Sequence, residues 1–273
     1  MTSSLRQFTL DNIELSLFIN RLQSVCTEMG ATLRCSSLSP NIKDRLDFSC
    51  AIFDPVGALC AQAAHIPVHL GSMAFAMEKI VGNISWNEGD VILVNDPYLG
   101  GTHLPDVTVI QPIFFEDQLV AFCANRAHHA DIGCDRPGSM PLSTDIHEEG
   151  LVIKPRHYLR NNEKDPDTME ILISSLRNPS ETLADFAAQI SANRAGVSTV
   201  LDLIQAMSLT KFKDGLKAIN LYAENMARIS LQNIPNGIYD AEDYMDGDGI
   251  SPGKIRIKAS LTFHDNSVTV DFA

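Results

Sequence analysis

The sequence lacks several features that define common protein classes. Its 273 residues contain no apolar run of the about 18 residues that a bilayer-spanning helix needs, and its first residues lack the basic-then-apolar order of a signal peptide. The phosphate-cradling motif GxxxxGK(S/T) is absent, and the six cysteines include no CxxC pair. We therefore expect a cytoplasmic protein with reduced, mostly buried cysteines, which does not hold ATP through a P-loop.

Positive charge is also scarce. The chain has 21 Lys and Arg against 34 Asp and Glu, a formal net charge of −13. Proteins that bind nucleic acid or an anionic membrane surface need clustered basic residues, so neither is an expected partner. The 45% of hydrophobic and 20% of charged residues are ordinary for a globular chain with a substantial core. At about 150 residues per domain, the length suggests one large or two small domains.

The amino-terminal region has the signature of a helix. Asp11 followed by Glu14 is an aspartate-headed capping box, and apolar residues recur at helical spacing from Leu15 to Met29. Gly30 is expected to end this helix in a left-handed conformation.

Two strand pairs follow, each around a turn. The first pairs 48–53 with 58–62 around the sequence DPVG at 54–57, and the second pairs 107–115 with 119–124 around EDQ at 116–118. Helical spacing returns at 181–231 as a long helical pair, and 255–263 and 268–272 form a last hairpin. These elements predict an α+β fold: an antiparallel or mixed sheet whose hairpins carry a metal site, packed with helices.

The charged segment 160–167, which contains Pro166, is the expected internal hinge. It divides the chain into a metal-site α/β region at 1–160 and a region at 161–273 with the helical pair and the last hairpin. The final strand pattern runs to Ala273 without a turn or polar tail, which suggests part of a longer domain.

Antiparallel pairing converts the turn positions into contacts between distant residues. A turn centred near Asp117 places Asp106 opposite His128 and His103 near Asp131. A turn centred at Pro55 and Val56 places Asp47 near Ala64 and His65. If both hairpins end at one edge of a sheet, two aspartates and two histidines form a four-ligand metal set of Asp47, His103, Asp106 and His128. Such a set suits zinc, manganese or iron, and its carboxylates favour the harder of these ions.

Other residues near this edge have roles that the sequence leaves open. Either His128 or His129 could point inward. His65 and His69 have the i, i+4 spacing of helical ligands, but Pro67 between them favours contact with substrate or with the ligands. Glu149 could be a general base or part of a solvated acidic turn. The predicted catalytic residues are Asp47, His129 and Glu149, and the predicted substrate-binding residues are His65, His69, Gly100 and Gly101.

Four motifs in the same region resemble those of one family. RLDFSCAIFD, HIPVHLGSM, VNDPYLGGTHLPDVTVI and RAHHADIG are similar, in this order, to motifs of the hydantoinase B/oxoprolinase family. The similarity runs from about Glu28 to Ala273. Complete members of the family are longer, so the chain resembles only their amino-terminal half.

This resemblance implies a division of labour between subunits. An A-type ATPase subunit would bind ATP and phosphorylate the carbonyl of a hydantoin, 5-oxoproline or other lactam. The B-type subunit would carry zinc or manganese, which activates the water that completes hydrolysis. The family's metal positions map onto Asp47, His103, Asp106 and His128. The resemblance also implies homo- and hetero-oligomers, and a further chain could supply the missing carboxy-terminal half.

Two other functions remain open. One is a ketone carboxylase subunit of the acetone carboxylase type, because the motifs do not separate it from the hydrolases. The other is a non-catalytic subunit that binds a partner through the long helices.

Overall fold

The computed structural model describes residues 10–64, 66–69 and 71–272, and the chain divides into two compact units between Lys217 and Ala218. The predicted boundary at 160/161 differs from this division. Strand β6 (Arg156–Arg160) pairs directly with β7 (Glu163–Lys164), and α4 (Pro166–Ser175) follows. The segment 160–167 therefore contains the turn of an edge hairpin and the start of α4, and it lies within the first compact unit.

The first unit is built on a seven-stranded sheet in the order β2-β1-β5-β4-β3-β6-β7, in which every neighbouring pair is antiparallel. The expected α+β class is confirmed. The remaining strands are β1 (Phe48–Phe53), β2 (Leu59–Ala64), β3 (Val91–Val94), β4 (Asp106–Phe115) and β5 (Gln118–His128). The β4–β5 hairpin lies at the centre of this sheet, so its ends are held by neighbours on both sides.

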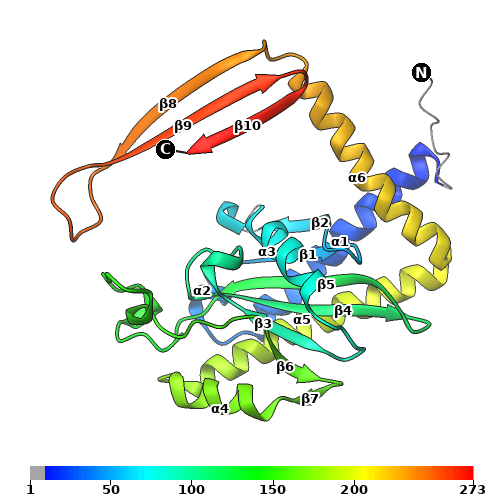
Figure 1. The fold of residues 1–273 in the computed structure, drawn as a ribbon. Coiled ribbons are helices and arrows are strands. Elements are labelled where there is room, and N and C mark those ends of the chain that lie inside the picture. The colour runs from blue at the N-terminus through cyan, green and yellow to red at the C-terminus, as the bar shows by residue number, and fades with distance from the viewer. Residues whose placement is uncertain (1–9, 65, 70, 273) are drawn as a thin grey trace. The chain divides into compact units, whose positions relative to one another are not determined.

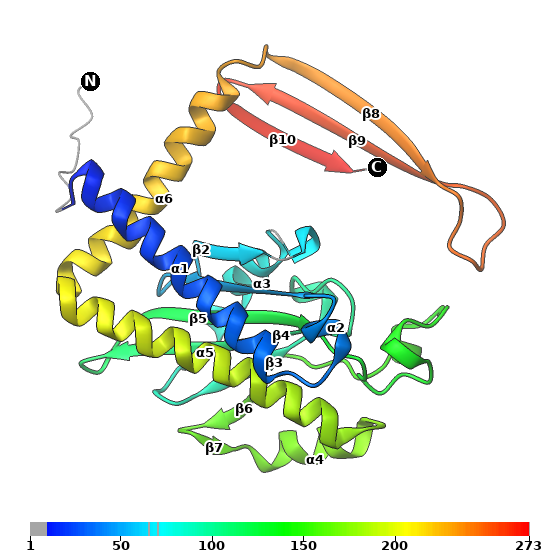
Figure 2. The same ribbon diagram turned by 180° about the vertical axis from the view of Figure 1, so that it is seen from behind.

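Helices cover both faces of the sheet. Helix α3 (Ser72–Ile80) lies on the face turned to the viewer in Figure 1, and α1 (Asn12–Ser36) and α5 (Pro179–Met207) cross the opposite face in Figure 2. The predicted helical pair consists of α5 and α6 (Leu209–Leu231), and α6 crosses the boundary between the units. The short helices are α2 (Pro40–Lys43), η1 (Pro67–His69), η2 (Val81–Asn83), η3 (Pro97–Leu99), η4 (Pro137–Ser139) and η5 (Ile146–Glu148).

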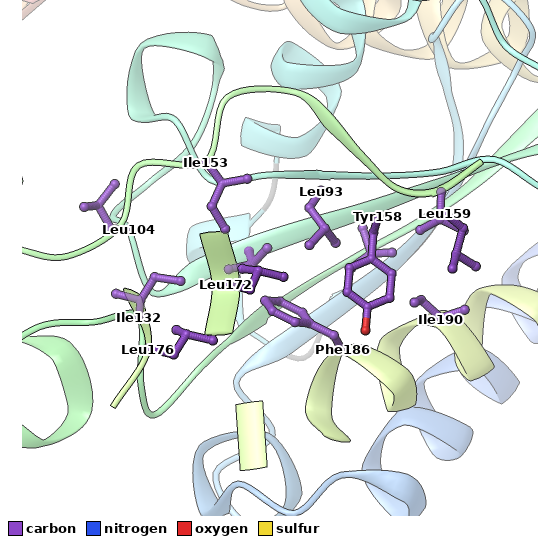
Figure 3. Packing of buried hydrophobic residues seen from close by; sticks show 13 residues of the cluster. Leu93, Leu104, Ile132, Ile153, Tyr158, Leu159, Leu172, Leu176, Phe186 and Ile190 are labelled. Atoms are coloured by element: carbon purple, nitrogen blue, oxygen red, sulfur yellow. The ribbon is translucent and has the colours of Figure 1, made fainter. Parts of the chain in front are cut away.

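Each face of the sheet has its own apolar core. On one side, Ile110 and Phe122 pack with Met77 of α3. On the other side, residues of β3 and β4 pack with α4 and with Phe186 and Ile190 of α5 (Figure 3). Because strand residues alternate between faces, β4 contributes even-numbered residues to the first core and odd-numbered residues to the second.

The first helix begins as predicted but ends later. The Asp11 carboxylate accepts hydrogen bonds from the backbone of Glu14, and the Glu14 carboxylate accepts one from the backbone of Asp11. The expected end at Gly30 is wrong, because α1 continues to Ser36. Leu33, beyond the glycine, is fully buried. Burying another leucine stabilises by about 1.5–3 kcal/mol, which exceeds the about 1 kcal/mol that glycine costs inside a helix.

The second unit contains a three-stranded antiparallel sheet in the order β10-β9-β8. The predicted last hairpin is confirmed as β9 (Ile255–His264) and β10 (Ser267–Phe272), and β8 (Gly237–Met245) was not expected. Among the described residues, no helix combines the length and the apolar character needed to cross a bilayer.

A glycine allows α1, α5 and β5 to approach closely. A Cβ atom on Gly196 of α5 would lie 2.5 Å from Sδ of Met29 and 2.9 Å from Sγ of Cys123. Met29 and Cys123 are both fully buried, so neither can move into solvent.

We expect Gly196→Ala to lower the free energy of unfolding, although alanine favours a helix. Overpacking a core typically costs about 1–3 kcal/mol, which outweighs the about 1 kcal/mol gained in helix propensity. The exposed Ser198→Ala on the same helix is the matched control and should be neutral or slightly stabilising. Chemical denaturation measures both variants. A Gly196→Ala protein as stable as the control would show that the contact has room for a methyl group.

Candidate metal centre

The paired ends of β4 and β5 place two of the predicted ligands side by side. Asp106 and His128 are directly opposite each other in the register, as the turn position predicted. Asp106 lies on the same face of β4 as Ile110, and His128 lies on the same face of β5 as Phe122. Both apolar residues pack beneath α3, so both ligands lie on the α3 face of the sheet.

Asp47 joins them through the neighbouring strand. Its backbone carbonyl accepts a hydrogen bond from the backbone N–H of His128 at 3.0 Å, just before β1 begins. The predicted pairing with Ala64 is wrong by two positions, since Ala64 pairs with Ser49 and an irregularity interrupts the register at Ile52 and Phe53. His65, the other predicted neighbour, lies outside the described residues.

Three of the four predicted ligands, His103, Asp106 and His128, have donor atoms within 4.8 Å of one another, and Asp47 adjoins this group at His128. Nε2 of His103 lies 3.0 Å from Oδ1 of Asp106 and 3.1 Å from Nδ1 of His128. Nδ1 of His128 lies 3.3 Å from Oδ1 of Asp106 and 3.8 Å from Oδ2 of Asp47. Two ligands of one tetrahedral zinc ion lie about 3.3 Å apart, because each sits about 2.0–2.1 Å from the metal. The donor atoms therefore have the spacing and chemistry of a divalent-cation site.

One carboxylate oxygen strengthens this conclusion. Oδ1 of Asp106 is buried and accepts no well-aligned hydrogen bond from the described residues, although two ring nitrogens lie within 3.3 Å of it. A buried acceptor without a partner is costly, and a cation among these nitrogens would satisfy it. The residues thus fit a bound divalent metal.

The other carboxylate oxygen is occupied. Oδ2 of Asp106 accepts a hydrogen bond from the Thr102 hydroxyl and lies 3.3 Å from Nε2 of His69. His69 is fully buried, and its Nδ1 lies 3.1 Å from the hydroxyl of Ser49. The sequence predicted that His69 contacts substrate or the ligands. The structure places it against the predicted ligand Asp106, and the fully buried ring with both nitrogens engaged leaves none free for a substrate. Thr102 and Ser49 were not among the predicted site residues.

Electrostatics favour an ionised carboxylate at the centre of the cluster. Burial alone would raise the pKa of Asp106, but polar contacts with three imidazoles outweigh burial and hold this pKa far below its usual range. The same contact raises the pKa of His103 above 6.5, against the opposing effect of burial, and the charges of Asp47 and Glu149 add to the increase.

His129 does not face this cluster. Neighbouring residues of an extended chain point to opposite faces, so His129 follows His128 onto the α5 side of the sheet. Its Nε2 lies 2.9 Å from Oε1 of Gln189, its ring packs against Phe186 at 4.4 Å, and burial lowers its pKa. The prediction of a catalytic His129 is therefore corrected: the ring belongs to the second core.

The two glycines of the ligand loop have a packing role. A Cβ atom on Gly100 would lie 2.6 Å from the backbone nitrogen of Ala76 in α3, and one on Gly101 would lie 2.7 Å from the carbonyl oxygen of Asn95. Gly100 also has a φ of +96°, which other residues rarely adopt. These contacts explain both glycines without a substrate, so substrate binding by Gly100 and Gly101 stays a prediction.

Glu149 lies at the edge of the site. It follows η5, is half-buried, and its Oε1 accepts a hydrogen bond from the Ser143 hydroxyl at 3.3 Å. Its charge reaches His103, the most exposed ligand with a side chain 39% accessible. The cluster is thus open on the side of His103 and Glu149.

Arg126 anchors the ligand loop and was missed in the sequence. This fully buried side chain on β5 donates to the Thr108 hydroxyl at 2.8 Å, the Ser72 hydroxyl at 2.8 Å and the Gly100 carbonyl at 3.0 Å. Burial lowers its pKa to about 10, and the charge of Asp106 opposes this effect. An arginine within a strand of mostly apolar residues is the signal that could have identified it.

With this geometry described, comparison with known proteins identifies the family. The hydantoinase B/oxoprolinase family matches residues 11–273. The chain belongs to this family. It is 38% identical to 5-oxoprolinase 1 of Arabidopsis thaliana over 96% of this chain and 23% of the plant protein. It is also 32% identical to a protein of Pseudomonas sp. strain NS671 that is named as the B component of a D-/L-hydantoinase, over 96% of this chain and 46% of that protein.

A solved structure has the same fold. The ATP-dependent caprolactamase of Pseudomonas jessenii matches with a TM-score of 0.87 and 27% identity, over 96% of this chain and 46% of the caprolactamase chain. The chain thus spans less than half the length of each of these relatives.

The raised pKa of His103 predicts how the stability of the metal-free protein depends on pH. The folded state favours the protonated ring, so this contribution is fully present below about pH 6.5 and is lost as pH rises through the higher folded-state pKa. Because the ring is partly exposed, we expect a loss of less than about 1 kcal/mol. Denaturation with a chelator present, at about pH 6 and pH 8, measures it. His103→Gln should show a smaller decrease than the unmodified protein, and equal decreases would contradict the assignment.

Proposed function

We propose that this chain is the metal-holding, B-type part of an ATP-dependent hydrolase that acts on cyclic amides such as hydantoins, 5-oxoproline or other lactams. The observation that supports it most directly is the group of His103, Asp106 and His128 around a buried Asp106 oxygen that accepts no well-aligned hydrogen bond from the described residues, with Asp47 adjoining at His128. The names of the plant, Pseudomonas and caprolactamase relatives support the reaction class.

The four ligands would hold zinc or manganese, with His103 Nε2, His128 Nδ1 and one oxygen from each aspartate as donors. A divalent metal in such a site supplies Lewis acidity and can lower the pKa of water from 15.7 to about 7. The ionised Asp106 carboxylate would offset part of the positive charge of the metal, and the two imidazoles would bind the metal in their neutral form. The side chain of Asp47 is 21% accessible, more than that of Asp106 and less than that of His103.

Glu149 is the proposed general base at the open side. Its carboxylate is fixed by Ser143 and is close enough to His103 to affect the pKa of that ring. A carboxylate there can accept the proton released when water attacks a carbonyl carbon. We also propose Asp47 as a catalytic group as well as a ligand, because its side chain is partly accessible to solvent.

ATP would act through a partner. An amide carbonyl is a poor electrophile, and phosphorylation of its oxygen by an A-type ATPase subunit would create a good leaving group. The part of the family fold that this chain does not span would be needed in the assembly, from the same protein or from a separate chain.

The test combines metal content with turnover. The chain, co-expressed with an A-type partner and with the part of the family fold that it does not span, should contain about one zinc or manganese ion per copy, measured by elemental analysis, a stoichiometry typical of a four-ligand site. It should hydrolyse a panel of hydantoins and lactams only with ATP. We expect His103→Ala and Asp106→Asn to lose both metal and turnover, because each removes a ligand.

His264→Ala is the control, because His264 is an exposed histidine of the second unit, outside the cluster. It should retain metal and activity. Protein that binds no metal after careful reconstitution would disprove the proposal. If the assembly converts a ketone with bicarbonate but hydrolyses no cyclic amide, the proposed hydrolase activity is wrong and the activity is ketone carboxylation.

A further inference from the structure

A buried histidine contacts the Asp106 carboxylate through the oxygen that does not face His103 and His128. His69 is the last residue of η1, the short helix that precedes α3, and Ser49 lies on β1. Both side chains are inaccessible to solvent. They form a chain of contacts to Asp106: Ser49 Oγ lies 3.1 Å from Nδ1 of His69, and Nε2 of His69 lies 3.3 Å from Oδ2 of Asp106.

The chemistry of the partners fixes the direction of these hydrogen bonds. An ionised carboxylate can only accept, so Nε2 of His69 must carry the hydrogen. In a neutral ring Nδ1 is then an acceptor, and the Ser49 hydroxyl donates to it. Ser49 thereby selects both the tautomer and the orientation of the imidazole.

These bonds determine which oxygen of Asp106 is available. Oδ2 is occupied by His69 and by the Thr102 hydroxyl, whereas Oδ1 accepts no well-aligned hydrogen bond within the described part of the chain and lies near His103 and His128. A carboxylate with one oxygen held and the other free presents a single donor atom in a fixed direction.

We infer that His69, oriented by Ser49, is a positioning residue that holds the Asp106 carboxylate so that Oδ1 faces the cation position between His103 and His128. This inference rests on the proposed metal function, but it assigns His69 no contact with metal or substrate. Residues that orient ligands in this way raise metal affinity, because the ligand need not be ordered when the ion binds.

A different role for His69 must be distinguished by experiment. Its ligand atom lies within 4.8 Å of those of Asp47 and Asp106, so these three could hold a second cation. The geometry favours positioning, because Nε2 is already directed at Oδ2 of Asp106 and Nδ1 at Ser49. A ligand role for Nε2 would require it to give up its hydrogen and its hydrogen bond to Oδ2, and Nδ1 would then donate to Ser49.

The experiment measures zinc and cobalt affinity of the whole chain by competition with a chelator, together with stoichiometry and the visible spectrum of bound Co²⁺. We expect His69→Ala to weaken binding by about 10- to 100-fold without changing the number of ions bound. His69→Gln should recover part of the loss, since its amide N–H can donate to Oδ2. Ser49→Ala should cause a smaller loss, because the imidazole remains.

His129→Gln is the matched control. It also removes a fully buried imidazole, but one bonded to Gln189 on the other face of the sheet. Its zinc affinity should equal that of the unmodified protein. If His69→Ala fails to fold, His69→Gln and Ser49→Ala still test the inference.

The outcomes separate this inference from the proposed function. Unchanged affinity in His69→Ala, His69→Gln and Ser49→Ala would overturn the positioning role and leave the metal site intact. Two ions in the unmodified protein and one in His69→Ala would make His69 a ligand and also overturn it. Unmodified protein without any bound metal would instead overturn the proposed function, and this inference with it.

Discussion

A carboxylate removed from solvent is the constraint around which this end of the sheet is organised. Transferring an ionised aspartate to the interior is costly unless opposite charge or hydrogen-bond donors compensate. Asp106 is 2% exposed, and three imidazoles and a threonine hydroxyl surround it. Arg126 adds a positive charge from the same face of the sheet. Removing any of these groups leaves part of the desolvation cost of the carboxylate unbalanced. The residues of the cluster therefore depend on one another for their stability.

Strand alternation then separates the chemistry from the core. Along β5, Arg126 and His128 face α3, whereas Asn125 and His129 face α5 and bond Gln189 and Asn193. The two faces carry different polar networks only one residue apart in sequence. The network beneath α5 consists of neutral amides and an imidazole whose pKa is lowered by burial, so it serves packing. The network beneath α3 contains charge and opens to solvent at His103.

The facing of Asp106 and His128 could be predicted from the position of the β4–β5 turn, although the hairpin differs locally from the expectation. It closes over Glu116 and Asp117, which both have positive φ angles, and this two-residue turn pairs Phe115 with Gln118. A register irregularity between Ile113 and Phe114 then shifts the pairing by one residue, so that Asp106 faces His128, the partner that a turn at 116–118 predicted. The β1–β2 hairpin also contains an irregularity, between Ile52 and Phe53, and there the predicted partner of Ala64 is wrong. The position of His69 depends on how η1 packs on the sheet, and the choice between His128 and His129 depends on which face α3 covers. Both depend on tertiary packing, which cannot be inferred from the local periodicity of the sequence.

The anchoring of Gly100 by Arg126 has a consequence for the order of assembly. Arg126 precedes His128 by two positions on the same strand, and its guanidinium holds both the loop that carries His103 and the first residue of α3. His69 lies just before that helix. A partly folded chain with the central hairpin paired but α3 undocked would therefore have neither the loop nor the histidine in position. The complete set of predicted ligands, with the residues that orient them, is consequently assembled only when α3 has docked.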